Sequence, residues 1–449
     1  MWIREIFSFL LISFLCNRAS TQSLLFTPTQ FTSHPADPPA RVTVGAYYYP
    51  WWYRHFQAPR GGGYVRRELL PRHDIRLGEY DDRSRAVIEQ HLLWSRQANI
   101  KVWVSSWWGP RSDTDDFLKN FTFPAVPVLT NLNDLKVAIL YETTGRIKES
   151  ENYNLSRVPT DFEYICQTMR YFDHPNYYRI NGRPVLVIYL TRKLDGQEIL
   201  DDVVPIIRSK CPNVFIIGDQ VWSSPPGSTL LYLDAVTNYG WYGNVGRPRY
   251  AGQARVNDYY AKSASWKEYA KIHNTYFVPV VSPGFNDRGV RLDLNHTAMS
   301  RRLDLNMPEG TLFAAQLLNA TKLIDSAIDS FMLVNSFNEW HEDTQIEPCI
   351  GTTTRDLYIY TQGIEYVGYD ALYLNILATY TTRTLTCQMD STWKSTTKAT
   401  CVSIQTKFLE KKDVTRDCLQ VSTTGSKGTQ ACSKVCNAQC RTSGPAIMV

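Results

Sequence analysis

Short apolar runs alternate with longer amphipathic segments between about residue 42 and about residue 380. Eight of these runs have the length and the β-branched or aromatic content of buried strands. They occupy residues 42–51, 100–108, 135–142, 184–190, 214–219, 233–239, 276–283 and the run that begins at residue 331. Most of the intervening segments carry apolar residues at helical spacing, for example between residues 87 and 98. This alternation predicts an α/β protein with the (β/α)8 architecture of a TIM barrel.

A doubly wound open sheet is the alternative fold, because it also alternates strands with helices. Such sheets usually have fewer strands, and no glycine-rich phosphate-binding loop follows the first run of this chain. The pattern therefore favours the barrel.

The two ends of the chain differ from the middle in composition. Arg4 precedes an apolar run at residues 6–16, and small residues follow at 19–21, which is the layout of a signal peptide. The run is about half of the roughly 20 residues that cross a bilayer, so an uncleaved anchor is the weaker alternative. We predict a signal peptide at 1–21, an irregular leader at 22–40, the barrel at 41–382 and a cysteine-rich tail at 383–449.

Sequons and cysteines indicate an oxidising, glycosylating compartment, hence a secreted or lumenal protein. The four sequons are at Asn120, Asn154, Asn295 and Asn319. Six of the 10 cysteines belong to the tail: Cys387, Cys401, Cys418, Cys432, Cys436 and Cys440. They predict a small disulfide framework whose pairing the sequence leaves open. Zinc binding is the alternative, but the tail has no histidine and no CxxC pair.

Charge gives no sign of a nucleic-acid partner. The chain has 48 Lys and Arg against 43 Asp and Glu, and its net charge of +5 is spread without a basic run. No other stretch is long and apolar enough to insert stably in a membrane, and we expect a monomer. Aromatic residues make up 13% of the chain, and many follow the predicted strands. Most of these rings belong to a core, and the rest could stack on sugars.

A barrel carries its active site at the carboxyl ends of its strands, so the residues there are the candidates. They are aromatic, acidic or amide side chains, namely Tyr48, Tyr49, Trp107, Trp108, Glu142, Tyr189, Tyr239, Trp241, Asn338, Glu339, His341 and Glu342. Aromatic rings together with carboxylates predict a site for an oligosaccharide or polysaccharide.

The stretch at residues 331–348, FMLVNSFNEWHEDTQIEP, concentrates this chemistry. Cleavage of a glycosidic bond needs one carboxylic acid and a second group that acts as base or nucleophile, and Glu339 and Glu342 supply such a pair. Surface salt bridges are the alternative role for both, but the buried strand before them and the aromatic surroundings favour catalysis. His341 is expected to position the substrate, although a histidine there could also transfer protons.

Other kinds of active site fit less well. Glu339, His341 and Glu342 could hold a metal, but no second histidine stands at ligand spacing, so neither a metal nor another cofactor is predicted. No G-x-S-x-G motif is present, and the cysteines look structural, which argues against a serine or cysteine hydrolase.

These motifs resemble glycoside hydrolase family 99, the endo-α-mannosidases, over roughly residues 43–380. The segment SFNEWHEDTQIE at 336–347 is similar to the family's signature around its two catalytic glutamates. Further matches, in chain order, are YYPWW at 48–52, LGEYDDRSRAVIEQH at 77–91, VSSWWGP at 104–110, HPNYYR at 174–179 and PVVSPGF at 279–285.

The resemblance implies a retaining, endo-acting hydrolase of α-mannosidic linkages. Glu339 would deprotonate the 2-hydroxyl of the sugar, which then attacks the anomeric carbon to form an anhydro sugar. Glu342 would be the acid at the leaving oxygen and later the base for water, and Glu142 would contact the sugar. Four aromatic residues match positions of the same cleft: Tyr48, Trp107, Tyr189 and Tyr239.

Two departures from the family bear on the substrate. Asp343 stands where the family usually has glycine, and its charge is expected to raise the proton affinity of Glu342. The segment YETTGR at 141–146 replaces an IEPY-like sequence. Three alternatives stay open: a barrel that binds glycans without cleaving them, a glycosidase of another linkage, and a functional tail that carries the barrel as cargo.

Overall fold

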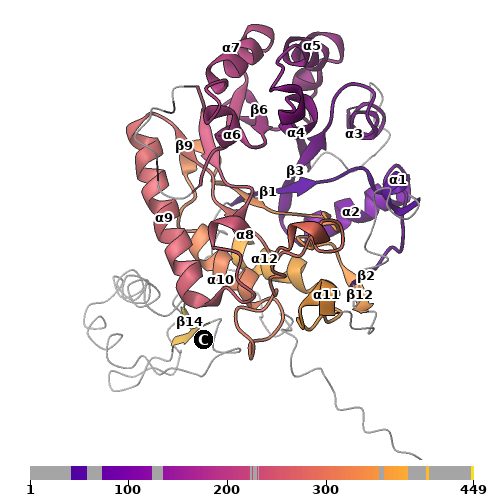
Figure 1. The fold of residues 1–449 in the computed structure, drawn as a ribbon, viewed down its shortest axis with the longest axis vertical. Coiled ribbons are helices and arrows are strands. Elements are labelled where there is room, and N and C mark those ends of the chain that lie inside the picture. Colours follow the sequence, from indigo (N-terminus) through magenta and orange to yellow (C-terminus); the bar gives the residue numbers. More distant parts are fainter. Residues whose placement is uncertain are drawn as a thin grey trace, which may run out of the picture.

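The computed structural model describes residues 42–57, 73–123, 135–222, 225, 230, 232–352 and 358–382, together with two short strands at 401–403 and 446–448. The predicted signal peptide and leader, and the predicted disulfides of the tail, lie outside the described residues. Figure 1 shows the described part as a curled sheet of strands with helices around it.

The sheet consists of parallel strands in the order β10-β11-β1-β3-β4-β6-β7-β8-β9. Their bounds are β1 (Thr43–Tyr48), β3 (Ile100–Trp107), β4 (Lys136–Tyr141), β6 (Arg183–Ile188), β7 (Phe215–Asp219), β8 (Ala235–Thr237), β9 (Tyr276–Phe277), β10 (Val280–Val281) and β11 (Phe331–Val334). All eight predicted runs therefore contain strands of one sheet.

The seventh predicted run brings the two ends of this strand order together. It holds both β9, which pairs with β8, and β10, which pairs with β11. Between them, Val278 N donates to Val236 O at 2.9 Å, and Pro279 O accepts from Leu333 N at 2.9 Å. Because proline has no N–H, the ladder is interrupted here and one run appears as two short strands. The strand order thus returns to its start, as an α/β barrel requires.

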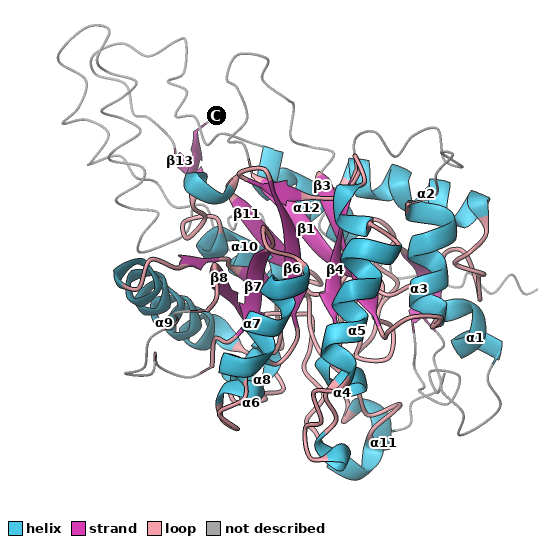
Figure 2. Ribbon diagram, turned by 90° about the horizontal axis from the view of Figure 1, so that it is seen from above, coloured by secondary structure: helices cyan, strands magenta, loops and turns pink. Residues whose placement is uncertain are grey.

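Helices surround the strands on the outside, as the two views in Figures 1 and 2 show. The longer ones are α2 (Arg85–Gln97), α5 (Arg157–Glu163), α7 (Leu200–Lys210), α9 (Gly252–Ile272), α10 (Thr311–Ala320) and α12 (Leu372–Thr382). The short ones are α1 (Trp52–Gln57), α3 (Asp113–Phe117), α4 (Thr143–Arg146), α6 (Thr191–Asp195), α8 (Trp241–Asn244) and α11 (Tyr358–Thr361). Single π-helical turns at Leu118–Thr122 and Tyr164–Thr168 extend α3 and α5.

Small strands complete the secondary structure. Strands β2 (His73–Ile75) and β12 (Cys349–Thr352) form an antiparallel pair. A second antiparallel pair joins β5 (Arg179–Ile180) to β6, and a third joins β13 (Cys401–Ser403) to β14 (Ala446–Met448).

Side chains of the strands alternate between two buried layers, as the period of a β-strand dictates. Along β1 and just beyond it, Tyr47 and Tyr49 belong to the cluster inside the barrel. Ala46 and Tyr48 belong instead to the larger cluster between the barrel and its helices. This alternation decides which of two adjacent aromatic residues can reach the mouth of the barrel.

A disulfide links Cys166, in the π-helical turn after α5, to Cys211 at the end of α7. This bridge lies outside the tail, where the cysteine pattern of the sequence predicts disulfides. A bridge between two helices of the barrel indicates an oxidising compartment. The remaining described cysteine of the barrel, Cys349, is a buried free thiol.

We expect the double variant Cys166→Ala/Cys211→Ala to lose stability. The bridge spans 45 positions of the chain. Closing a loop of that length stabilises by about 4 kcal/mol in the chain-entropy model. Urea unfolding of the double variant beside the wild type measures the difference, and equal midpoints would contradict the expectation.

Two further features concern the surface. Among the described residues, no helix combines the length and the apolar character needed to span a bilayer. Three of the four predicted sequon asparagines, Asn120, Asn154 and Asn295, are exposed. Asn319 is half-buried in α10 and donates to Ala315 O at 2.9 Å, which makes it the poorest glycan acceptor of the four.

Candidate active site

A cavity of about 490 Å³ opens where the strands end. It is bounded by aromatic, acidic and basic side chains that come from seven loops of the barrel, those after β1, β3, β4, β6, β8, β10 and β11. These lining residues are Tyr49, Trp51, His55, Trp108, Glu142, Thr144, Tyr189, Tyr239, Val290, Arg291, Glu339, His341 and Glu342. Both glutamates of the predicted pair, and the third carboxylate Glu142, therefore face one space.

Glu339 lies at the floor of the cavity and is only 3% exposed. Its backbone N–H donates to Ser336 Oγ at 2.8 Å, and its Oε1 accepts from the backbone N–H of His341 at 2.8 Å. Burial raises the pKa of this carboxyl well above its usual value, and the charge of Glu342 raises it further. The turn after β11 thus holds a carboxyl group of high proton affinity in a defined orientation.

Glu342 stands beside it and interacts with two loops of the barrel. Its Oε1 lies 2.8 Å from Arg291 Nη1, and its Oε2 accepts from Tyr239 Oη at 3.4 Å. Burial alone would lower the pKa of Arg291, but the carboxylates of Glu342 and Asp287 outweigh it and raise that pKa. Arg291 therefore stays a cation next to Glu342.

Glu142 follows β4 and is held by a chain of hydrogen bonds from β3. Ser106 Oγ donates to Glu142 Oε1 at 2.7 Å, and Trp108 Nε1 donates to Ser106 Oγ at 2.9 Å. Burial raises the pKa of Glu142 to about 8, and the charge of Glu342 adds to this, while the bond from Ser106 opposes it. A neutral carboxyl group at this position can donate a hydrogen bond to a sugar oxygen.

We expect this group to make stability fall as the pH rises. Its folded pKa of about 8 exceeds the usual 4.5, so the unfolded chain ionises first. The contribution of Glu142 to the free energy of unfolding is complete below about pH 4.5 and is lost by about pH 8. Over this range the free energy of unfolding falls by no more than about 1.4 kcal/mol per pH unit. Between about pH 5 and about pH 8, the melting temperature of Glu142→Gln should therefore rise relative to that of the wild type. A difference that stays constant with pH would contradict this.

Tyrosines and a tryptophan–histidine stack form the walls. Tyr49 Oη and Tyr239 Oη are hydrogen-bonded at 2.6 Å, and the ring of Tyr189 meets that of Tyr239 edge to face with centroids 5.0 Å apart. On another side, the rings of Trp51 and His55 are stacked with centroids 4.9 Å apart. Flat apolar faces with polar edges suit a sugar ring.

Four predicted site residues do not line the cavity. Tyr48 and Trp107 occupy the outward-facing positions of β1 and β3, where Tyr48 Oη bonds His91 Nδ1 at 3.0 Å and Trp107 Nε1 donates to Asp115 Oδ1 at 2.9 Å. Trp241 is buried in the same outer layer. These three residues were predicted to face the cavity, and the structure places them in the outer layer instead. The sequence pattern did not assign the alternating faces of the strands.

Asn338, the fourth of them, supports the cavity from behind. Its Oδ1 accepts from Tyr49 N at 2.8 Å, and its Nδ2 donates to Tyr49 O at 3.1 Å. This pair of bonds ties the loop after β11 to the loop after β1, and it holds Tyr49 at the cavity wall.

Glu347, the third glutamate of the 331–348 stretch, has a structural role. Its carboxylate is fully buried and accepts from Tyr80 Oη at 2.9 Å and from Trp340 Nε1 at 2.8 Å. His91 Nε2 lies 3.2 Å from its other oxygen. It anchors the loop after β11 to α2 rather than facing the cavity.

Sequence reasoning missed four lining residues, His55, Thr144, Val290 and Arg291, whereas Trp51 stands at the end of the first predicted strand in the YYPWW motif. One signal was available, because His55 follows Trp51 by one helical turn and bonds His341 Nε2 at 2.8 Å through its Nδ1. Burial lowers the pKa of His55 to about 4, so this pair is held without a charge on His55. Arg291 had no signal, because it lies in an irregular loop after β10.

Comparison with known proteins finds a family whose model matches part of the chain. Residues 257–385 match the model described as Glycosyl hydrolase family 99. This part of the chain, 129 of its 449 residues, is therefore similar to that family. The rat protein named glycoprotein endo-alpha-1,2-mannosidase is 24% identical over 351 residues, which cover 71% of this chain and 70% of the rat protein. The Xenopus laevis protein of the same name is 24% identical over 359 residues, covering 71% and 73%.

A solved structure supports the fold. The family 99 endo-alpha-mannosidase of Bacteroides thetaiotaomicron aligns with a TM-score of 0.50 and 23% identity, covering 75% of this chain and 95% of that chain. The similarity of the two folds agrees with the α/β barrel described above.

Asp343 departs from the family's usual glycine, and its geometry explains how it is tolerated. Its backbone φ of 55° lies in the left-handed region, which glycine adopts most readily and which aspartate tolerates better than most residues. Its Oδ1 lies 3.2 Å from Nη2 of the buried Arg301. Arg301 thereby compensates the negative charge that Asp343 adds.

Within the part of the chain that the structure describes, no three histidine, cysteine, aspartate or glutamate side chains gather as a metal site. The protein groups that face the cavity are those of acid–base catalysis.

Proposed function

We propose that this chain is a retaining, endo-acting hydrolase of α-mannosidic linkages in mannose-containing glycans. The observation that carries the proposal is the meeting of Glu142, Glu339 and Glu342 in one cavity with aromatic walls. The names of its relatives in rat and frog supply the linkage class.

In the first step, Glu339 takes the proton of the sugar's 2-hydroxyl, and that oxygen attacks the anomeric carbon. The bond to the leaving oxygen breaks as Glu342 donates a proton to it, which leaves a 1,2-anhydro sugar. The high proton affinity of Glu339 supports its role, because a strong base is needed to deprotonate a weakly acidic hydroxyl. Once Glu342 has given its proton to the leaving oxygen, its carboxylate is paired with the cation of Arg291, whose Nη1 lies 2.8 Å from Glu342 Oε1.

In the second step, the ionised Glu342 takes a proton from water, and the water oxygen attacks the anomeric carbon. The bond between this carbon and O2 breaks, and Glu339 returns its proton to O2. Each displacement inverts the anomeric carbon, so two of them restore its original configuration. The product therefore has the same anomeric configuration as the substrate.

The other residues of the cavity bind and orient the sugar. We assign sugar contacts to Glu142, Tyr49, Trp108, Tyr189 and Tyr239, and we assign positioning of Glu339 to His341. The stacked Trp51 and His55 extend the aromatic wall that a second sugar ring would meet.

We also propose that the protein is secreted or resides in the lumen of the secretory pathway, with a barrel at 41–382 and a separate cysteine-rich tail at 383–449. The disulfide between Cys166 and Cys211 supports an oxidising compartment.

Incubation with a panel of α-mannans and glucosylated high-mannose glycans tests the proposed function. Mass analysis of the products should reveal fragments longer than one sugar, because an endo-acting enzyme cuts inside the chain. Release of single sugars only, or tight binding without any product, would overturn the proposal.

A further inference from the structure

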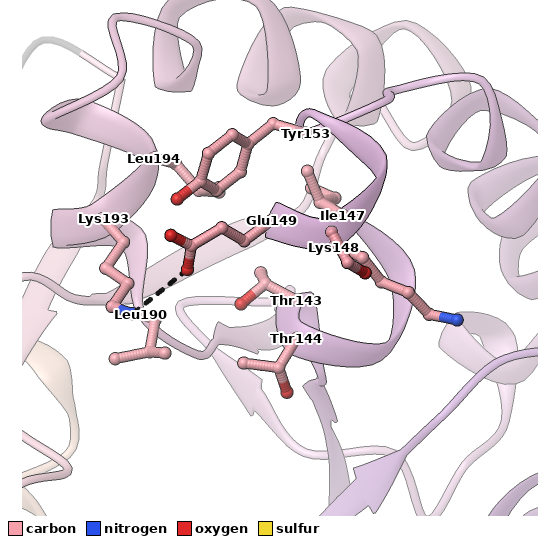
Figure 3. A pocket seen from close by; sticks show the side chains of 10 residues that line it. Thr143, Thr144, Ile147, Lys148, Glu149, Tyr153, Leu190, Lys193 and Leu194 are labelled. Carbon is pink, nitrogen blue, oxygen red and sulfur yellow. Dashed lines mark ion pairs between the residues drawn. The ribbon is translucent and has the colours of Figure 1, made fainter.

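A second cavity of about 260 Å³ lies beside the catalytic one, and Thr144 lines both. The two spaces share two stretches of backbone. After β4, Glu142 faces the catalytic cavity while Thr143 faces the second one, and after β6 the same holds for Tyr189 and Leu190. The second cavity therefore lies against the wall of the active site. Figure 3 shows the side chains that line the second cavity, among them Thr144.

Apolar side chains line one part of this second cavity, and a matched pair of charges lies at its rim. Ile147, Leu190 and Leu194 are buried, and the ring of Tyr153 is half-buried beside them. At the rim, Lys193 Nζ and Glu149 Oε2 lie 3.9 Å apart, and both side chains are largely exposed. Such a loose pair uses little of the hydrogen-bonding capacity of either group.

The charges of this cavity balance each other. Glu149 and Lys193 face each other in Figure 3, whereas Lys148 extends away from the other side chains. Lys148 Nζ lies 3.4 Å from Glu151. The combination of an aromatic ring, an apolar floor and neutralised polar groups at the rim suits an uncharged, hydroxyl-rich ring rather than an ionic ligand.

Two residues of the cavity are held in unusual backbone conformations. Leu190 has a φ of 53° and Tyr153 a φ of 54°, both in the left-handed region that bulky residues rarely adopt. Asp219 Oδ2 accepts from Leu190 N at 3.1 Å, and Lys148 O accepts from Tyr153 N at 2.9 Å. Strain that the surrounding structure maintains in this way is typical of ligand-binding sites.

We propose that this second cavity is a subsite that binds a neutral sugar residue of the same glycan chain, outside the sugars that flank the cleaved bond. The inference rests on the proposed function, because an endo-acting enzyme needs a substrate that continues past the catalytic cavity. Tyr153 supplies the stacking face, and Glu149 and Lys193 bond the sugar's hydroxyls.

Oligosaccharides cut from α-mannan, from disaccharides to hexasaccharides, provide the probe. For the wild type, kcat/KM should rise as the chain becomes long enough to reach the subsite. Tyr153→Ala and Glu149→Ala should each lower kcat/KM on the long substrates by about fivefold, the size expected for one lost aromatic or polar ligand contact, and leave the short substrates unchanged. The exposed Glu149 keeps the test independent of any folding defect in Tyr153→Ala.

Glu163→Ala is the matched control, because Glu163 is also an exposed glutamate paired with a lysine, Lys210, at 3.0 Å. It should behave as the wild type on every chain length. Equal losses on short and long substrates, or no loss on either, would overturn the subsite.

A binding measurement separates failure of the subsite from failure of the proposed function. Calorimetry with the hexasaccharide is carried out on Glu339→Gln and on Glu339→Gln/Glu149→Ala. Weaker binding by the double variant supports the subsite even if the wild type cleaves nothing, in which case only the proposed function fails. Equal binding by the two variants, or binding by neither, overturns the subsite.

Discussion

Glu339→Gln is expected to abolish nearly all glycan cleavage and to leave the fold intact. General acid–base groups contribute about 10² to 10⁴ in rate, so kcat should fall within that range. Glutamine keeps the shape of the side chain, and its oxygen can still accept the bond from His341 N. Because burial raises the pKa of Glu339, removing the ionisable group should not lower the melting temperature near neutral pH. Steady-state kinetics and thermal melting of the purified variant measure both effects.

Glu309→Gln is the control for this experiment. Glu309 is also buried with a raised pKa, chiefly because of burial, but it bonds Tyr373 in the layer between the barrel and its helices and does not line the cavity. Its kcat should stay close to that of the wild type. Full activity of Glu339→Gln, or an equal loss in Glu309→Gln, would remove Glu339 from the catalytic pair.

Glu342→Gln is expected to lose activity in a way that depends on the leaving group. On glycans kcat should fall by about 10² to 10⁴, because a sugar leaving group needs a proton. On a dinitrophenyl α-mannoside, whose leaving group needs none, the first step should survive. The second step still lacks its base, so a burst of dinitrophenolate should precede slow turnover. Stopped-flow absorbance measures the burst, and an equal loss on both substrates without a burst would contradict the role of Glu342 as acid.

The sequence predicted the barrel well because buried parallel strands are apolar on both faces and therefore stand out as short continuous runs. The split of the run at 276–283 was harder to foresee. Pro279 interrupts its hydrogen-bond ladder, and only the pairing partners reveal that β9 and β10 close the strand order.

The sequence predicted those residues of the candidate site that directly follow a strand. Glu339, His341 and Glu342 come directly after one strand. Their place at the cavity therefore follows from the position of that strand alone, without knowledge of contacts to distant parts of the chain. Tyr48 and Trp107 were assigned to the cavity because strand ends alone do not tell which face a side chain takes. The neighbours Tyr49 and Trp108 take the inner face, one residue further along each strand.

Contacts between distant loops could not be predicted from local pattern. Arg291 reaches Glu342 from the irregular loop after β10, and Arg301 compensates Asp343 from a segment more than 40 positions away. The disulfide between Cys166 and Cys211 joins two helices in the same way. Such pairings depend on tertiary packing, which a single sequence does not specify.

In the proposed reaction, the 2-hydroxyl of the sugar and then water attack the same anomeric carbon, while Glu339 and Glu342 move the protons. Proton NMR of the first product formed from an α-mannan oligosaccharide tests it most directly, before the new reducing end equilibrates between its anomers. We expect the α-anomer to appear first. Initial release of the β-anomer would show a single displacement and would contradict it.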